Sequence, residues 1–191
     1  MPLPRLLCLL LSILLAGCVG DSDRAKPWLE SLRHELGHLG ARNWVVIAES
    51  AFPIHSRRGL RVIELDGEIP DVVDAVERVI DEKSYLTPRI YVATEAASVP
   101  YDYAPGIKLY RKELETALHG RETVQLDHKM LLRMLGNVNQ TYRVLVIKTC
   151  TALPYTSVFM EMGSGYWDAE SESALREVIE NNNESKLSNP Q

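Results

Sequence analysis

Two groups of residues in this chain have types and spacing that could carry chemistry. The first is the run from His34 to His38 (HELGH), which fits the H-E-x-x-H pattern. On a helix its two histidines lie on one face and could share a zinc ion, with Glu35 as the general base. A catalytic zinc needs a third protein ligand, and Ala41 and Trp44 stand where the extended pattern has a glycine and a histidine. We therefore disfavour a zinc hydrolase and expect no metal site.

The second group consists of residues that directly follow predicted strands. Glu49 comes immediately after the apolar run 44–48 (WVVIA). A carboxylate at the end of an apolar strand is costly unless it is paired or functional, so Glu49 is a candidate for ligand binding or catalysis. The alternative is a salt bridge from Glu49 to Arg42 or Arg61.

Tyr155 and Cys150 both follow the segment 142–147 (YRVLVI), which we interpret as a buried strand. The ring of Tyr155 could stack on a ligand while its hydroxyl forms hydrogen bonds, and the alternative is a core residue with an exposed tip. Cys150 has no local activating motif, so we interpret it as a small residue at the end of a strand. No glycine-rich phosphate loop follows any predicted strand, so we expect no nucleotide site.

These candidates must be positioned by a framework in which strands alternate with helices. Apolar runs, and alternating apolar residues at 60–65 (LRVIEL), predict strands at 44–48, 60–65, 90–93, 124–126, 142–147 and 157–160. Helical spacing predicts helices at 28–36, 69–80, 107–118, 128–135 (ended by Gly136) and 169–179, with a long loop at 94–106. Because the central strands are apolar on both faces, we expect an α/β three-layer sandwich with a mainly parallel sheet. Ligands of such sheets bind outside the carboxyl ends of the strands.

The composition fits one globular domain with terminal extensions. The chain has 191 residues, of which 46% are hydrophobic and 25% charged. Its net charge of -5 argues against a nucleic-acid partner, which normally requires a basic excess. We place the α/β domain at 27–168 and assign 169–191 to a C-terminal helix and a disordered tail.

The N-terminus predicts export and lipid anchoring. Arg5 precedes an apolar run, Leu6–Leu15, that is too short to span a bilayer as a helix. The following Leu15-Ala16-Gly17-Cys18 is similar to a bacterial lipobox. We predict a signal peptide at 1–17, lipid on Cys18 and a tether at 18–26, and hence a lipid-anchored protein of the cell envelope. Val19, and not Asp, follows the cysteine. In a host with two membranes, the resemblance to sorted lipoproteins then favours the outer membrane, facing the periplasm. An ordinary signal peptide or a buried helix is the alternative.

From Leu36 to Trp167 the chain resembles the D-ribose pyranase / L-fucose mutarotase family (RbsD/FucU). The resemblance is carried by the stretch 39–53, the turn at 65–67 with its following helix, and the stretch 153–159. It implies an α/β sandwich around a mostly parallel sheet, a ribose- or fucose-like monosaccharide as ligand, and no cofactor. It also implies a ring-like homo-oligomer with sites near subunit boundaries.

The resemblance also implies roles for particular residues, because the family interconverts sugar ring forms by acid–base proton transfer. Glu49 matches the family's acidic catalytic position, where the usual residue is Asp. His128 matches a second histidine if 136–140 is an insertion. The remaining substrate-binding residues match a late Tyr-x-Asn segment, and they are Tyr155, Thr156 and Ser157.

The family's first histidine, its principal proton donor, has two possible matches here. The ungapped comparison places Ala41 at this position, whereas a three-residue shift places His38 there. His38 would then be catalytic together with Glu49, and the protein would be an active isomerase. If Ala41 is the true match, the protein would be a catalytically degenerate sugar-binding or scaffold lipoprotein.

Overall fold

A computed structural model describes residues 27–54 and 58–187 of the chain. The predicted signal peptide, the tether and its lipidated Cys18 lie outside the described residues. No helix in the described part of the chain combines the length and apolar character that a membrane crossing requires.

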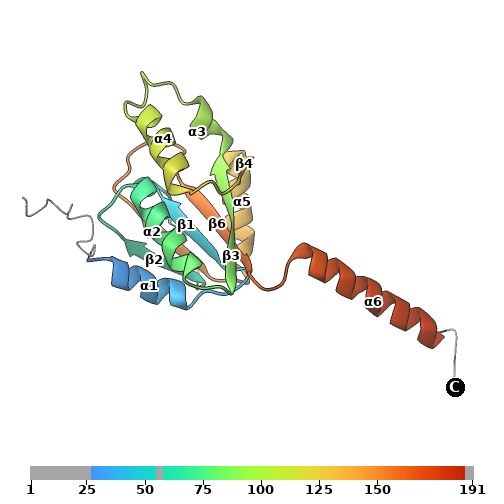
Figure 1. Ribbon diagram of the computed structural model, residues 1–191. Helices are drawn as coiled ribbons and strands as arrows, with labels where there is room; N and C mark the ends of the chain where they lie inside the picture. The colour runs from blue at the N-terminus through green and yellow to red at the C-terminus, as the bar shows by residue number, and fades with distance from the viewer. Residues whose placement is uncertain (1–26, 55–57, 188–191) are drawn as a thin grey trace, which may run out of the picture.

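The described residues form six strands and six helices (Figure 1). The strands are β1 (Trp44–Ala48), β2 (Leu60–Glu64), β3 (Leu86–Ala93), β4 (Thr123–Leu126), β5 (Val144–Lys148) and β6 (Val158–Ser164). The helices are α1 (Leu29–Gly37), α2 (Ile69–Asp81), α3 (Thr94–Ser98), α4 (Ile107–Ala117), α5 (His128–Val138) and α6 (Ala169–Leu187). Strands and helices therefore alternate along most of the chain, as the sequence predicts.

The strands make one mixed sheet in the order β2-β5-β1-β6-β3-β4. Strands β1 to β5 run in the same direction, and β6 lies antiparallel between β1 and β3. The predicted mainly parallel sheet is confirmed. Because β6 runs the opposite way, its first residues lie at the same edge of the sheet as the carboxyl ends of the other strands.

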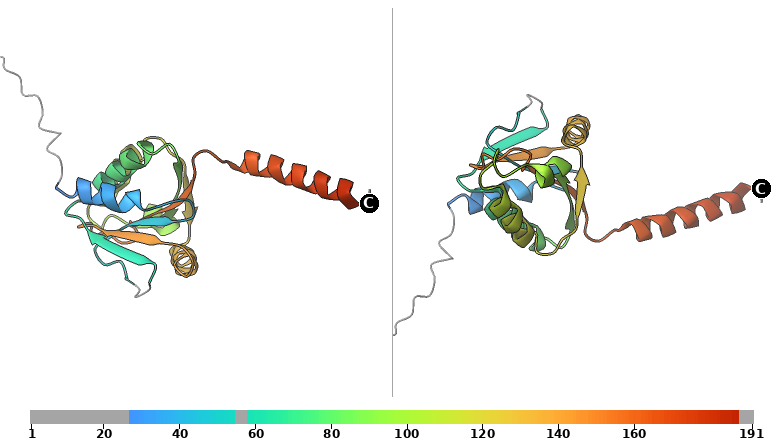
Figure 2. Two further views of the ribbon diagram at one scale, coloured as in Figure 1. Left: turned by 90° about the horizontal axis from the view of Figure 1, so that it is seen from below. Right: turned by 90° about the horizontal axis from the view of Figure 1, so that it is seen from above.

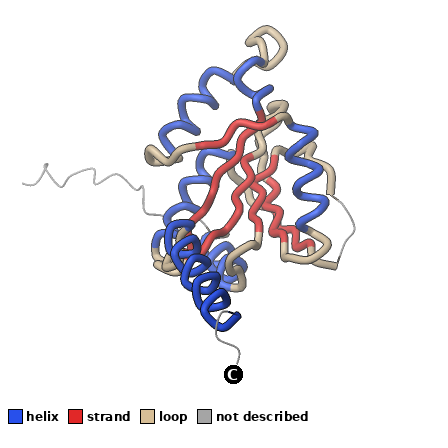
Figure 3. Tube along the Cα trace, turned by 90° about the vertical axis from the view of Figure 1, so that its right-hand side faces the viewer, coloured by secondary structure: helices blue, strands red, loops and turns tan. Residues whose placement is uncertain are grey.

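Helices cover both faces of the sheet, which gives three layers (Figure 3). Helices α1, α2 and α4 pack on one face, where Val45 and Ile47 of β1 point. Helix α5 covers the other face, where Leu131 packs with Trp44 and Val46. Every residue of β1 is buried, which explains its uninterrupted apolar sequence.

Several boundaries differ from those predicted: β3 begins at Leu86 instead of residue 90, and β6 continues to Ser164 instead of ending at residue 160. Helix α5 continues through Gly136 to Val138, and the Asn139 amide still donates to the Leu135 carbonyl oxygen at 3.0 Å, so the glycine does not end it. The predicted loop after β3 contains the short helix α3, whose end is held by Arg111 donating to the Ala96 and Val99 carbonyls. Such a contact between distant residues leaves no local signal in the sequence.

Helix α6 is longer than the predicted 169–179 segment and continues to Leu187, where a disordered tail was expected. It projects away from the three-layer body (Figures 1 and 2). Its start is defined by two local contacts: Asp168 accepts from the Ser171 amide at 2.8 Å, and the Trp167 indole donates to Glu172 at 2.8 Å. An acidic cap of this kind satisfies a free amide at the helix start.

Candidate functional site

The carboxyl edge of the sheet brings together polar residues from four strands. Glu49 directly follows β1, Glu95 lies just after β3, and His128 begins α5 after β4. Ser157 immediately precedes the antiparallel β6. The sheet topology therefore gathers side chains that are more than 100 residues apart in the sequence, such as Glu49 and Ser157.

Glu49 is half-buried and held from two sides by Ser157. The Ser157 hydroxyl donates to the Glu49 carboxylate and accepts from the Glu49 backbone amide at 3.2 Å. This reciprocal contact fixes the position of the carboxylate. The alternative salt bridges are not formed, because Arg42 donates to the Tyr142 hydroxyl and Arg61 pairs with Glu35.

His128 is positioned by the start of α5. Its backbone amide donates to both carboxylate oxygens of Glu95 at 3.1 Å, and Asp127 caps the same helix by accepting from the Met130 amide. The imidazole packs edge-to-face on the ring of Tyr155, with centroids 5.3 Å apart. Its Nδ1 atom is buried and has no hydrogen-bond partner among the described residues. A ring nitrogen in this state is available to a ligand or a water molecule.

The segment that carries Tyr155 is fixed from beneath by a buried tyrosine. Tyr110 of α4 donates its hydroxyl to the Thr156 carbonyl oxygen at 2.5 Å, and the Thr156 hydroxyl donates to the Leu153 carbonyl at 2.7 Å. Burial, followed by the negative charge of Glu49, raises the pKa of Tyr110 well above its usual value, so its hydroxyl remains a donor. Tyr155 itself has a left-handed backbone (φ 62°) and is exposed, with 40% of the residue accessible to solvent.

A cavity of about 370 Å³ opens between these residues, and Glu49, His128 and Tyr155 line it together. Lys148 fixes its rim by donating to the carbonyls of Ser50 and Phe52, at 2.6 and 3.1 Å. A second cavity of about 500 Å³ adjoins it through Tyr155 and contains Glu95. A carboxylate, an imidazole and an exposed aromatic ring around one small cavity suit a polyhydroxylated ligand.

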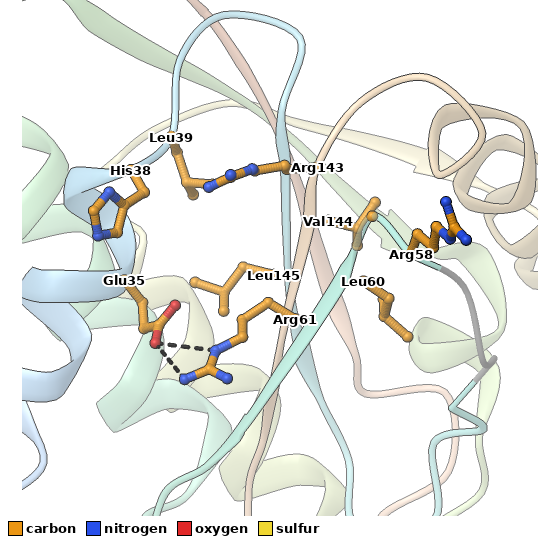
Figure 4. Close-up of a pocket in the computed structure, with 10 residues that line it drawn as sticks. Glu35, His38, Leu39, Arg58, Leu60, Arg61, Arg143, Val144 and Leu145 are labelled. Carbon is orange, nitrogen blue, oxygen red and sulfur yellow. Dashed lines mark hydrogen bonds and ion pairs between the residues drawn. The ribbon is translucent and has the colours of Figure 1, made fainter.

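The structure does not bring His38 to this cavity. His38 is exposed and lines a different cavity with Leu60 and Val144, which are the first residues of β2 and β5 (Figure 4). It therefore lies at the amino edge of the sheet. The strand from Trp44 to Ala48 alone spans about 13 Å at about 3.3 Å per residue. The predicted pair of His38 and Glu49 consequently does not converge within one chain.

The H-E-x-x-H motif has part of the geometry of a metal site. The Nε2 atoms of His34 and His38 are 3.4 Å apart. Glu35, however, is paired with Arg61, whose hydrogen bonds lower the pKa of this carboxyl. Among the residues that the structure describes, no group of three or more His, Cys, Asp or Glu side chains could hold a metal ion. The arrangement therefore offers neither a third ligand nor a free general base to a zinc hydrolase.

Cys150 lies at the carboxyl edge, exposed and free. Its thiol contacts the Asp66 carboxylate at 3.4 Å, and this hydrogen bond raises the pKa of the thiol. A raised pKa leaves less thiolate, which is the nucleophilic form. The environment of Cys150 therefore opposes a role as a nucleophile.

Three contributors to the site were missed from the sequence. Glu95 orients the start of α5, Tyr110 supports the Tyr155 segment, and Lys148 fixes the cavity rim. Glu95 and Lys148 have a recognisable signal, since each lies at the carboxyl end of a predicted strand. Tyr110 lies within a helix and has no such signal, because its contact with Thr156 depends on how α4 packs.

No protein-family model matches the chain, and a search of curated proteins finds no match. Among solved structures, the chain is similar to RbsD from Bacillus subtilis complexed with D-ribose, at 20% identity and a TM-score of 0.47, covering 70% of this chain and 91% of that one. It is also similar to FucU from Bifidobacterium longum (17%, TM-score 0.47, covering 70% and 92%). A third is the fucose mutarotase from Streptococcus pneumoniae in complex with L-fucose (19%, TM-score 0.46, covering 70% and 91%). The chain is thus structurally similar, at low identity, to members of the family that its sequence resembles.

Proposed function

We propose that this chain binds a monosaccharide in the cavity at the carboxyl edge of its sheet and interconverts the ring forms or anomers of that sugar. The observation that carries the proposal is that Glu49 and His128 line the same cavity beside the exposed ring of Tyr155. The sequence resemblance to pyranases and mutarotases supports the same ligand class.

Binding would use the polar and aromatic groups in complementary ways. The ring of Tyr155 offers an apolar face to the C–H groups of a sugar, while the carboxylate of Glu49 accepts hydrogen bonds from its hydroxyls. The buried Nδ1 atom of His128 lacks a partner among the described residues and gains one when a ligand or its bound water is present. Ribose- and fucose-like sugars are the expected ligands.

The reaction needs two proton transfers and no cofactor. The Glu49 carboxylate removes the proton from the anomeric hydroxyl, and the protonated imidazole of His128 delivers a proton to the ring oxygen. The bond between the anomeric carbon and the ring oxygen then breaks, which gives the open-chain aldehyde. The ring closes again when a hydroxyl of the sugar attacks the aldehyde carbon and both proton transfers are reversed. Attack on the other face of the aldehyde gives the other anomer, and attack by a different hydroxyl gives a different ring size.

Saturation-transfer NMR on ribose and fucose tests the catalytic proposal directly. We expect micromolar protein to accelerate anomer exchange above buffer, and expect Glu49→Gln and His128→Asn to reduce this acceleration by about 10²–10⁴-fold. His119→Asn is the matched control, because His119 is an exposed histidine that pairs with Asp74. No acceleration by the unmodified chain would refute the catalytic proposal.

A catalytically degenerate sugar-binding protein is the second candidate. One observation favours it: neither match for the family's first histidine supplies a proton donor beside Glu49 within one chain. His38, the match after a three-residue shift, lies at the opposite edge of the sheet. Ala41, the match in the ungapped comparison, has no acid–base group. Calorimetry with a panel of monosaccharides distinguishes the candidates. Binding without accelerated exchange indicates the degenerate protein, and absence of both indicates a scaffold.

We also propose a homo-oligomer, as the resemblance implies, in which a neighbouring copy could bring its His38 to Glu49. His38→Ala and Glu49→Gln chains provide the test. If sites are shared between copies, both variants lose exchange activity, and unfolding and refolding them together restores part of it. If His38→Ala alone keeps full activity, the proton transfers belong to Glu49 and His128 of one chain.

Lipid attachment at Cys18 and location in the outer membrane, facing the periplasm, are the last parts of the proposal. They rest on the sequence alone. Mass spectrometry of the purified N-terminus should find a mature chain that starts at Cys18 and carries acyl chains. Cys18→Ala should abolish the modification and release the protein from the membrane fraction, whereas an unmodified wild-type N-terminus would contradict the anchor.

A further inference from the structure

The cavity at the amino edge of the sheet has a composition unlike the rest of this acidic chain. It measures about 360 Å³ and contains Arg58, Arg61 and Arg143, together with His38. Its only acidic lining residue is Glu35. We propose that this cavity binds the phosphate group of an organic phosphate, a function separate from sugar binding at the carboxyl edge.

The charge of this cavity is mostly uncompensated. Glu35 pairs with Arg61, and no carboxylate among the described residues forms an ion pair with Arg58 or Arg143. In a chain with a net charge of -5, three arginines around one cavity with a single carboxylate form a local positive field. Such a field attracts an anion, and guanidinium groups match the oxygens of a phosphate with paired hydrogen bonds.

The close-up shows how the cations are arranged (Figure 4). Arg143 extends from the start of β5 toward Leu39, on the side where His38 lies. Arg61 reaches from β2 to the Glu35 carboxylate, and Leu145 lies between the two arginines. Arg58 points away from this group and marks the far end of the cavity. The phosphate is therefore expected near Arg143 and Arg61.

The floor of the cavity is apolar. It is formed by Leu39, Leu60, Val144 and Leu145. An inorganic ion would leave these side chains uncovered, whereas a phosphate attached to an apolar or ring-shaped group would cover them and satisfy the cations together. The ligand class is therefore an organic phosphate, either a small soluble phosphomonoester or the headgroup region of an anionic phospholipid.

Calorimetry of the full chain with phenyl phosphate tests the proposal, because this probe combines a phosphate with an apolar ring. We expect saturable binding that Arg143→Gln weakens about tenfold or more, whereas the matched control Arg133→Gln, an exposed arginine on α5, leaves it unchanged. Glu35→Gln should strengthen binding severalfold, because it frees Arg61 from its carboxylate partner. A purely structural role for Glu35 would not produce tighter binding.

Vesicle sedimentation distinguishes the two sources of phosphate. Binding to phosphatidylglycerol vesicles that exceeds binding to phosphatidylcholine vesicles, and that Arg143→Gln abolishes, identifies the lipid headgroup. Phenyl phosphate binding without this lipid dependence identifies a soluble phosphomonoester. Any contribution of the N-terminal segment to vesicle binding is the same in the Arg143→Gln and Arg133→Gln variants. The proposal is overturned if phenyl phosphate does not bind saturably and vesicle binding does not depend on Arg143. It is also overturned if the Arg143→Gln and Arg133→Gln variants bind phenyl phosphate with equal affinity.

Discussion

Replacing Tyr110 with phenylalanine tests the support of the candidate sugar site. The hydroxyl of Tyr110 is buried and donates to the carbonyl of Thr156 at 2.5 Å. Phenylalanine keeps the ring but leaves this carbonyl without its partner. A buried acceptor that loses its donor costs about 1–3 kcal/mol, so we expect the free energy of unfolding to fall by about this amount at pH 7.

The same substitution should also affect the cavity, because it loosens the backbone of the segment that carries Tyr155 and Ser157. Thr156 is followed by Ser157, which holds Glu49, and preceded by Tyr155, whose left-handed conformation depends on the fixed segment. Loosening this segment removes part of the preorganisation of the cavity. We expect sugar affinity to fall about fivefold, equivalent to about 1 kcal/mol.

The pH dependence provides an independent signature. Burial and the charge of Glu49 raise the pKa of Tyr110 in the folded protein, so this residue ionises first in the unfolded chain. Its contribution to stability is fully present below the unfolded pKa of about 10 and is lost as pH rises toward the folded pKa. At pH 11, ionisation of Tyr110 in the unfolded chain lowers the free energy of unfolding of the wild type by about 1.4 kcal/mol. The Tyr110→Phe protein has no hydroxyl at this position and does not undergo this loss. The difference between the two proteins should therefore shrink by about 1.4 kcal/mol from pH 7 to pH 11.

Urea unfolding followed by far-UV circular dichroism at both pH values measures these differences. Tyr103→Phe is the control, because the side chain of Tyr103 is 86% exposed, and its stability should match the wild type at pH 7. The reasoning is refuted if Tyr110→Phe is as stable as the wild type at pH 7, or if the difference between them grows with pH.

Three further predictions concern a neighbour of the site, a close backbone contact elsewhere in the fold, and the free thiol. Glu95→Gln removes a charged acceptor from the His128 amide and should cost about 1 kcal/mol in urea unfolding and weaken sugar binding in calorimetry, unlike Glu122→Gln on the surface. Gly165→Ala would place a Cβ 2.5 Å from the Ser84 carbonyl oxygen and should lower the melting temperature, whereas Gly40→Ala, with no atom within 4 Å, should lower it less. Cys150→Ala should leave exchange activity unchanged in the NMR assay, and a large loss would contradict the inactive thiol.

Much of the fold could be predicted because buried parallel strands leave a strong local signal. The runs 44–48 and 144–147 are apolar at every position, since helices cover both faces of these strands. The position of β6 could not be predicted, because a short apolar run carries no information on its direction. The prediction that Gly136 ends its helix was wrong, because the packing of Leu131 and Leu135 holds this helix and outweighs the low helical propensity of glycine.

The candidate site was predictable only where its residues occupy strand ends. Glu49 and Tyr155 follow apolar runs, so the rule for the carboxyl edge places both correctly at one cavity. The same rule gives no guidance for His38, which precedes its strand and therefore lies at the other edge. The contribution of Tyr110 depends on tertiary packing, which one sequence does not reveal.

The distance between the two edges constrains every functional model of this chain. Glu49 and Arg143 lie at opposite ends of the parallel strands β1 and β5, about 20 Å apart along the strand direction. A single monosaccharide is too short to contact both within one copy. The proposed hydroxyl chemistry at one edge and the proposed phosphate recognition at the other would therefore be separate events in a monomer. His38 could act on a ligand of Glu49 only when two copies meet with unlike edges together. Complementation between His38 and Glu49 variants measures this contact, while phenyl phosphate binding measures the amino edge alone.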